Sequence, residues 1–295
     1  MSHSKNRTRS ALVALGATAT ILLAGCSAPA VQVTTAPGEL PQAYIDAGQI
    51  TASTICDGAP FSFCDAGSTT AKGVFADIAA AWGDVLGVKV DPIGMAFDSI
   101  LPSTASGRYD IVLAIGDTVE RQAQFDFIDI LHSSYAITVP AGNPKGVKEQ
   151  LDLCGLIVAS TTGSAEAQTV DALSTECTSK GKAAIESLQL GDLGSVYLSL
   201  SSGRADAAWG SDASSYTIEA QSPDLYKVAF EVPSDTVFAI AVPKSNPELR
   251  DAIAVAVAKI IENGKYLEVL DKWHLATQGL DELTINREPA KVPGT

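Results

Sequence analysis

Apolar segments and amphipathic helical patterns alternate through the first third of the chain, and this alternation restricts the possible folds more than any other feature. Short apolar runs at 50–55, 88–91 and 111–115 predict strands. Helical patterns lie between them, at 73–86 and from Phe97 to a stop at Gly107. The order strand, helix, strand, helix, strand is typical of a parallel α/β sheet.

A second α/β unit is predicted between residues 141 and 236. Its strands are expected at 156–159, 183–188 and 205–209, and its helices end near Cys177 and Ser201. The chain length of 295 residues also favours two domains, since a domain takes roughly 150 residues.

Two similar strands, at 135–140 and 237–242, flank this second unit. The chain therefore leaves the first unit near residue 140 and returns near residue 240. Two crossing strands would form a hinge with a ligand cleft between two lobes. The predicted domains are 46–138 with 241–287 for lobe 1, and 139–240 for lobe 2.

The N-terminus has the pattern of an export signal. Lys5, Arg7 and Arg9 precede an apolar stretch that is too short to span a bilayer, and Leu22-Leu-Ala-Gly-Cys26 resembles a bacterial lipobox. We expect residues 1–25 to be a lipoprotein signal peptide, Cys26 to be lipidated, and 26–45 to be a flexible tether. The body would then lie outside the cell membrane, anchored to it. A plain signal peptide with a chance Cys is the alternative.

The net charge of −14 argues against nucleic acid and against an anionic membrane surface as partners. The other four cysteines, Cys56, Cys64, Cys154 and Cys177, suit an oxidising compartment. Three pairings are possible. We prefer Cys56–Cys64 and Cys154–Cys177, because each joins close residues within one lobe. A zinc site is the alternative, but no CxxC pair or His cluster supports it, and no cofactor is expected.

The end of the strand at 111–115 is the first candidate site. Asp117 and Glu120 have the spacing of a capping box that opens a short helix. Free N–H groups at a helix start favour an anion, and Arg121 follows in the same turn. A guanidinium beside such groups can receive a carboxylate. The alternative is a capped helix with an exposed Arg.

Two further segments are candidates on pattern alone. The strand at 156–159 runs into a hydroxyl-rich helix start, with Glu166 in its first turn. Phe61 lies in the loop between Cys56 and Cys64. It is either a core residue or a face on which a ligand stacks.

Many short fragments, in order, resemble one family. They are Ala59–Phe63, Gly73–Asp77, Ser106–Ile111, Thr118–Arg121, Phe125–Phe127, Thr161–Gly163, Ser202–Ala207, Ala239–Pro243, Pro247–Arg250, Asn263–Tyr266 and Lys272–Trp273. Over residues 50–275 they resemble the extracellular solute-binding proteins of the polar amino-acid type, the capture subunits of ABC importers. The lipobox agrees, since Gram-positive members are tethered in this way.

The resemblance implies a two-lobed periplasmic-binding-protein type II fold that captures a small amino-acid-like solute. Arg121 would pair with the ligand α-carboxylate, and Thr162, beside Thr161, would bond the same group. The ligand side chain would meet aromatic residues, and its α-ammonium would meet a carboxylate. The residues implied for these roles are Phe61, Phe97 and Asp212.

Two positions depart from the family pattern. The family usually has a Ser or Thr five residues before its Arg, where this chain has Gly116 followed by Asp117. Both are therefore expected at the site. The family carboxylate usually lies five residues after the Asp of the Gly-Arg-x-Asp motif. That offset gives Ser211 here, with Asp212 one further, so either a bulge restores Asp212 or the contact with the α-ammonium is different.

An enzyme is the main alternative. His132 and His274 are the histidines left after signal cleavage, and no hydrolase, zincin or P-loop motif is present. Some relatives of this fold are dehydratases of small carboxylates, for which Asp77, Asp117 and Asp212 are the candidate acids. Asp77 is better explained as a structural helix residue. A surface sensor is a third possibility. We expect a non-enzymatic monomer, on an actinobacterial-like Gram-positive membrane, that docks on a permease.

Overall fold

The computed structural model describes residues 38–291. The expected signal peptide, Cys26 and most of the expected tether lie outside this range. The last part of that tether is structured, because Leu40 is buried in the core and helix α1 spans Gln42–Ala47. No helix within 38–291 has both the length and the apolar character needed to cross a membrane.

The first predicted sheet is present. Strand β1 (Gln49–Thr54) pairs in parallel with β5 (Lys89–Gly94) and with β6 (Ile111–Gly116). Helices α2 (Val74–Leu86) and α3 (Phe97–Ala105) connect them. The apolar stripe of α2 is buried, as its spacing predicts.

The second α/β unit is also present. Strands β8 (Ile157–Thr161), β9 (Glu186–Leu190) and β10 (Ala207–Ser211) pair in parallel around β8. Each strand runs into a helix, and the three helices are α4 (Ala165–Ser179), α5 (Leu193–Ser201) and α6 (Asp212–Gln221). The helix N-termini therefore lie at the carboxyl ends of the strands, where ligands bind in sheets of this kind.

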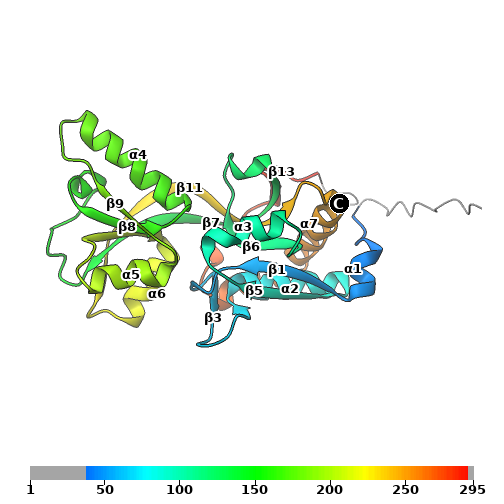
Figure 1. The fold of residues 1–295 in the computed structure, drawn as a ribbon. Helices are drawn as coiled ribbons and strands as arrows, with labels where there is room; N and C mark the ends of the chain where they lie inside the picture. Colours follow the sequence, from blue (N-terminus) through cyan, green and yellow to red (C-terminus); the bar gives the residue numbers. More distant parts are fainter. Residues whose placement is uncertain (1–37, 292–295) are drawn as a thin grey trace, which may run out of the picture. The chain divides into compact units, whose positions relative to one another are not determined.

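Two long antiparallel strands join the two units, as the sequence predicts. Strand β7 spans Phe125–Pro140 and β11 spans Tyr226–Pro243, and they lie side by side (Figure 1). β11 also pairs with β6 of lobe 1, whereas β7 also pairs with β10 of lobe 2. One mixed sheet thus continues through both lobes, in the order β5-β1-β6-β11-β7-β10-β8-β9. The register of the two strands shifts at three places, between Val228 and Phe230, between Val232 and Thr236, and between Phe238 and Ala239.

Each lobe has its own apolar core. In lobe 1, α2 packs against α7 (Pro247–Glu262) and α8 (Lys265–Lys272). The chain then ends in short elements, which are η3 (Ala276–Gln278), β12 (Thr284–Ile285) and β13 (Glu288–Pro289). Strand β12 pairs with β7 at Ile128.

Both preferred disulfides are present. Cys56–Cys64 and Cys154–Cys177 have Cα–Cα distances of 4.7 and 5.6 Å. The first bond holds a small sheet of β2 (Asp57–Gly58), β3 (Ser62–Cys64) and β4 (Ala71–Lys72). Gly94 packs so closely on this bond that an added Cβ would lie 2.0 Å from Cys56 Sγ. The loop that carries Phe61 is therefore fixed at both ends.

Candidate functional site

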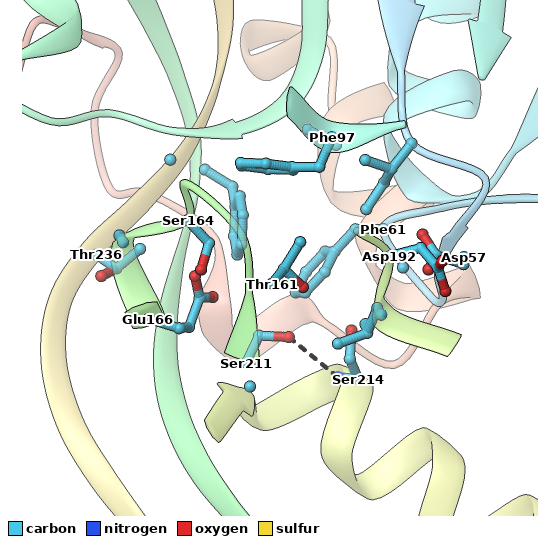
Figure 2. A pocket seen from close by; sticks show the side chains of 18 of the residues that line it. Asp57, Phe61, Phe97, Thr161, Ser164, Glu166, Asp192, Ser211, Ser214 and Thr236 are labelled. Atoms are coloured by element: carbon cyan, nitrogen blue, oxygen red, sulfur yellow. Dashed lines mark hydrogen bonds between the residues drawn. The ribbon is translucent and has the colours of Figure 1, made fainter. Parts of the chain in front are cut away.

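A pocket lies where the two lobes meet (Figure 2). Lobe 1 contributes Ile55, Asp57, Gly58, Phe61, Phe97, Ala114, Gly116 and Arg121, and strand β11 contributes Thr236 and Phe238. Lobe 2 contributes Thr161, Ser164, Ala165, Glu166, Asp192, Leu193, Trp209, Gly210, Ser211 and Ser214. The lining combines aromatic walls with a few charged and hydroxyl side chains, as small-molecule sites do.

Arg121 is the one Lys or Arg among the described residues that line the pocket. Its guanidinium donates to the Gly116 carbonyl at 2.8 Å in lobe 1 and to the Gly163 carbonyl at 3.2 Å in lobe 2. It also lies 5.7 Å from the ring centre of Phe97. Burial lowers the pKa of Arg121, and the nearby Glu166 carboxylate opposes this shift. Arg121 therefore presents a fixed, partly desolvated cation that contacts both lobes.

Three carboxylates, Asp57, Glu166 and Asp192, line the same pocket. Glu166 lies toward Arg121, whereas Asp57 and Asp192 lie together at the other end (Figure 2). Burial raises the pKa of Glu166, and bonds to its own N–H and to Ser164 oppose this shift. Burial also raises the pKa of Asp57; the Gly194 N–H lowers it, and Asp192 raises it further. The pocket is thus lined by three acids and one guanidinium.

The N-termini of three helices border the pocket, each capped by a pocket side chain. The Ser164 hydroxyl accepts from Ala167 N–H at 3.1 Å at α4, and Asp192 accepts from Ser195 N–H at 2.6 Å at α5. Ser211 accepts from Ser214 N–H at 3.3 Å at α6 (Figure 2). The positive end of α4 lies next to Arg121, because Gly163 accepts from its guanidinium. A carboxylate is favoured between these two groups.

Phe61 is a core residue that also lines the pocket. Its side chain is 3% exposed and its ring lies 4.7 Å from that of Phe238, yet it lines the pocket. Phe97 lines the pocket as well. The aliphatic part of a ligand would lie against these rings.

Five of the residues expected at the site line the pocket, namely Arg121, Phe61, Phe97, Gly116 and Thr161. The other three, Thr162, Asp117 and Asp212, do not. At Thr162 the backbone N–H bonds to Leu190, and the helix cap that faces the pocket is Ser164, two residues further on. Ser164 stands in the hydroxyl-rich segment that the sequence singled out.

Asp117 is fully buried and does not line the pocket, and it does not open a helix. The expected capping box is absent, because residues 119 and 120 form a turn and a 3-10 helix begins at Arg121. The Asp117 carboxylate accepts from the Gln122 side chain at 2.8 Å, and Arg287 Nε lies 3.6 Å away. Burial raises the pKa of Asp117. The hydrogen bond from Gln122 and the charges of Arg287 and Arg121 oppose this shift.

Asp212 points away from the pocket, and Ser211 takes the pocket position. The register of β10 is regular through Ser211, so no bulge restores Asp212. Its carboxylate instead accepts from Ser133 and from Gln278, both at 3.2 Å. Asp77 has the structural role predicted for it, since it accepts from Lys272 and Trp273.

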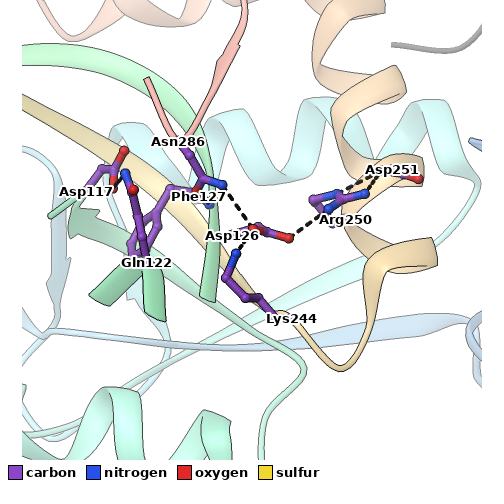
Figure 3. A network of polar contacts seen from close by, with 8 residues as sticks. All are labelled: Asp117, Gln122, Asp126, Phe127, Lys244, Arg250, Asp251 and Asn286. Carbon is purple, nitrogen blue, oxygen red and sulfur yellow. Dashed lines mark hydrogen bonds and ion pairs between the residues drawn. The ribbon is translucent and has the colours of Figure 1, made fainter. Parts of the chain in front are cut away.

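Two buried aspartates on β7 have opposite pKa shifts. Burial would raise the pKa of Asp126, but bonds from Lys244, Asn286 and Arg250 lower it below its usual value (Figure 3). For Asp129, burial raises the pKa to about 6, although Thr284 and the Arg287 N–H donate to it. The difference arises because Asp126 has two cations at its carboxylate.

The raised pKa of Asp129 predicts a stability change with pH. The folded chain holds this proton more tightly than the unfolded chain, whose pKa is about 3.9, so stability from this group is present at low pH and is lost as pH rises to about 6. The free energy of unfolding of Asp129→Asn, relative to that of wild type, should therefore rise by on the order of 2–3 kcal/mol from pH 4 to pH 7. Urea unfolding of both proteins across this range measures the gain. A difference that stays constant with pH would contradict it.

Comparison with known proteins identifies the family. Residues 50–276 match the bacterial extracellular solute-binding proteins, family 3. The chain belongs to this family. It is 30% identical to the arginine-binding protein ArgT of Corynebacterium glutamicum, over 85% of this chain and 82% of that one. The predicted function of solute capture is confirmed at this level.

Solved structures agree with the fold. An ancestral arginine-binding protein bound to arginine is 31% identical, with a TM-score of 0.69 over 77% of this chain and 98% of that one. A mutant of ArgBP from T. maritima is 25% identical, with a TM-score of 0.69 over 79% and 98%. The predicted two-lobed type II fold is therefore confirmed.

The pocket residues Asp57, Glu166, Asp192 and Ser164 were not among the expected ligand contacts. Ser164 and Glu166 carried a usable signal, since both stand at a helix start directly after a strand. No local sequence pattern marked Asp57 as a pocket residue, because its partner Gly194 is 137 residues away in the sequence.

Proposed function

We propose that this chain captures an amino acid with a cationic side chain and delivers it to the permease of an ABC importer. The observation that carries the proposal is the charge arrangement of the pocket, where one guanidinium at one end faces two carboxylates at the other. ArgT and the ancestral structure, both named for arginine, support the same class of ligand.

A bound ligand would span the pocket between these ends. Its α-carboxylate lies between Arg121 and the start of α4, where a cation and the positive end of a helix favour an anion. Glu166 is the acid on the same side and receives the α-ammonium, the role that Asp212 was expected to have. The side-chain cation lies between Asp57 and Asp192, whose mutual repulsion it relieves.

Closure of the lobes makes the binding selective. Asp57 of lobe 1 accepts from the Gly194 N–H of lobe 2 at 2.8 Å, and Arg121 donates to both lobes, so the two ends of the pocket are formed only when the lobes meet. A ligand that contacts both ends binds the closed form more tightly and shifts the population toward it.

The charge of the ligand side chain provides the test. Citrulline has nearly the shape of arginine but a neutral end, so arginine should bind about 10- to 100-fold more tightly, as expected for charged hydrogen bonds. Asp57→Asn keeps an oxygen for Gly194 and should reduce this ratio. Calorimetric titration measures both ligands on both proteins.

Asp224→Asn serves as the control, because Asp224 is exposed and does not line the pocket. An Asp57→Asn variant with the wild-type ratio, or a wild type that does not distinguish arginine from citrulline, would refute the proposed ligand class.

We further propose that the chain is not an enzyme, so a bound amino acid should be recovered unchanged after long incubation. The relatives described above are named as binding proteins. Product analysis by mass spectrometry tests this, and conversion of the ligand would favour the dehydratase alternative. No group of His, Cys, Asp and Glu suited to a metal ion occurs in residues 38–291.

The proposed location is the outer face of a Gram-positive cell membrane, with the monomer anchored through Cys26. The basic residues, apolar stretch and lipobox-like sequence before Cys26 support the anchor. Cys26→Ser should release the protein into the medium, which fractionation would detect. The lobe limits near residues 139 and 240 also stand as proposals, and they rest on the path of β7 and β11.

A further inference from the structure

The C-terminal hairpin lies beyond the part of the chain that matches the family. The match ends at residue 276, whereas β12 and β13 follow at 284–289. Strand β12 pairs with β7 at Ile128, so the hairpin is attached to a strand that continues into the hinge. The hairpin turn contacts Asp117 through Arg287, and Asp117 directly follows the pocket residue Gly116.

The turn of this hairpin has an unusual backbone. Asn286 and Arg287 both have positive φ, 55° and 66°, as a two-residue type I′ turn requires. Asn suits the first position, but Gly is usual at the second, and a long side chain there is disfavoured. Such a conformation persists when its surroundings hold it. Asn286 supplies part of this hold, because its side chain accepts from Phe127 N–H at 2.9 Å and donates to Asp126 at 3.0 Å.

Arg287 also holds the turn in place, through hydrogen bonds to two buried Asp residues of lobe 1. Its N–H donates to Asp129 at 2.9 Å, and its guanidinium donates to the Asp117 carbonyl at 2.5 Å. Arg287 Nε lies 3.6 Å from the Asp117 carboxylate, which is 0% exposed. A buried carboxylate needs such a partner, since an unpaired one is strongly unfavourable.

Asp117 connects Arg287 to the pocket. It directly follows Gly116, whose carbonyl accepts from the Arg121 guanidinium at 2.8 Å. The Asp117 N–H donates to Val237 of β11 at 2.9 Å. Asp117 is thus held by β11 through its N–H and by Arg287 through its carbonyl, directly after the residue that orients Arg121.

We propose that Arg287 is a positioning residue for ligand binding, which holds the turn at residues 116–121 so that Arg121 is oriented before the ligand arrives. The proposal rests on the proposed function in one respect, that Arg121 receives the carboxylate of the ligand. It assigns to the C-terminal hairpin a part in binding, although the hairpin does not line the pocket.

Hydrogen exchange of the ligand-free protein tests the first half. In Arg287→Ala, amides in 116–122 should exchange about tenfold faster, the change expected when a charged hydrogen bond to a buried group is lost. Arg287→Lys should restore part of the protection, because it keeps the charge. Glu288→Ala, an exposed position in the same hairpin, should match wild type. Unchanged exchange in Arg287→Ala, or an equal increase in α4 of lobe 2, would overturn the proposal.

Calorimetric titration with arginine tests the second half. Arg287→Ala should bind about 3- to 30-fold more weakly than wild type, with Glu288→Ala unchanged. Equal affinities in wild type and Arg287→Ala would overturn the positioning role even if exchange had changed. If wild type bound no amino acid, the proposed function would fail, whereas the exchange experiment would still decide whether Arg287 holds the turn.

Discussion

Arg121→Ala is expected to weaken arginine binding by about 2–4 kcal/mol, roughly 30- to 1000-fold in affinity. The loss arises because the ligand carboxylate would remain beside the start of α4 without its cation. The two contacts that Arg121 makes, to Gly116 and Gly163, would also be lost, so the lobes would close less readily. Isothermal titration calorimetry measures the change.

Two further variants make the result specific. Arg204→Ala removes an exposed Arg of lobe 2 and should bind as wild type does. Arg121→Lys should recover only part of the affinity, because an ammonium cannot make the forked contact of a guanidinium. Affinity in Arg121→Ala within twofold of wild type would contradict the role of Arg121.

Asp126→Ala is expected to lower the free energy of unfolding by roughly 2–4 kcal/mol. This loss is smaller than for breaking a fully buried ion pair, because Lys244 and Arg250 are partly exposed. Its carboxylate accepts from Lys244 at 2.6 Å, Arg250 at 2.7 Å and Asn286 at 3.0 Å (Figure 3). One side chain therefore ties β7 to the start of α7 and to the C-terminal hairpin. Urea unfolding measures the loss.

The pH dependence of this variant distinguishes the charge from the packing. Because the pKa of Asp126 is lowered in the folded chain, its stabilisation is present above the unfolded pKa, near 3.9, and is lost as pH falls through the folded pKa. The difference between Asp126→Ala and wild type should thus shrink in acid. Asp46→Ala, an exposed control, should show little change at any pH. A difference that persists undiminished at pH 3 would contradict the electrostatic explanation.

The sequence pattern predicted the strands and helices of both lobes because their apolar periodicity reflects which face is buried. It underestimated β7, which begins at Phe125 and not near Tyr135. Residues 125–131 are all buried and include Asp126 and Asp129, so no alternation of polar and apolar residues marks them as a strand. Only the distant partners of these acids, such as Arg250 and Thr284, explain their burial.

The candidate site was predictable where the signal was local. Arg121 was expected from the end of a strand and Phe61 from a bridged loop, and both line the pocket. Asp117 was misplaced because its spacing to Glu120 fits a capping box, whereas its contacts are with Gln122 and with Arg287, 170 residues away. Whether Ser211 or Asp212 lies at the pocket depended on the register of β10. That register is set by pairing with β7, a strand distant in the sequence.

The most direct test of the central claim is a titration with agmatine, which is arginine without its carboxylate. If Arg121 and the start of α4 hold that carboxylate, wild type should bind agmatine about 30- to 1000-fold more weakly than arginine, and this preference should be much smaller in Arg121→Ala. Agmatine binding wild type as tightly as arginine would show that Arg121 does not receive the ligand carboxylate.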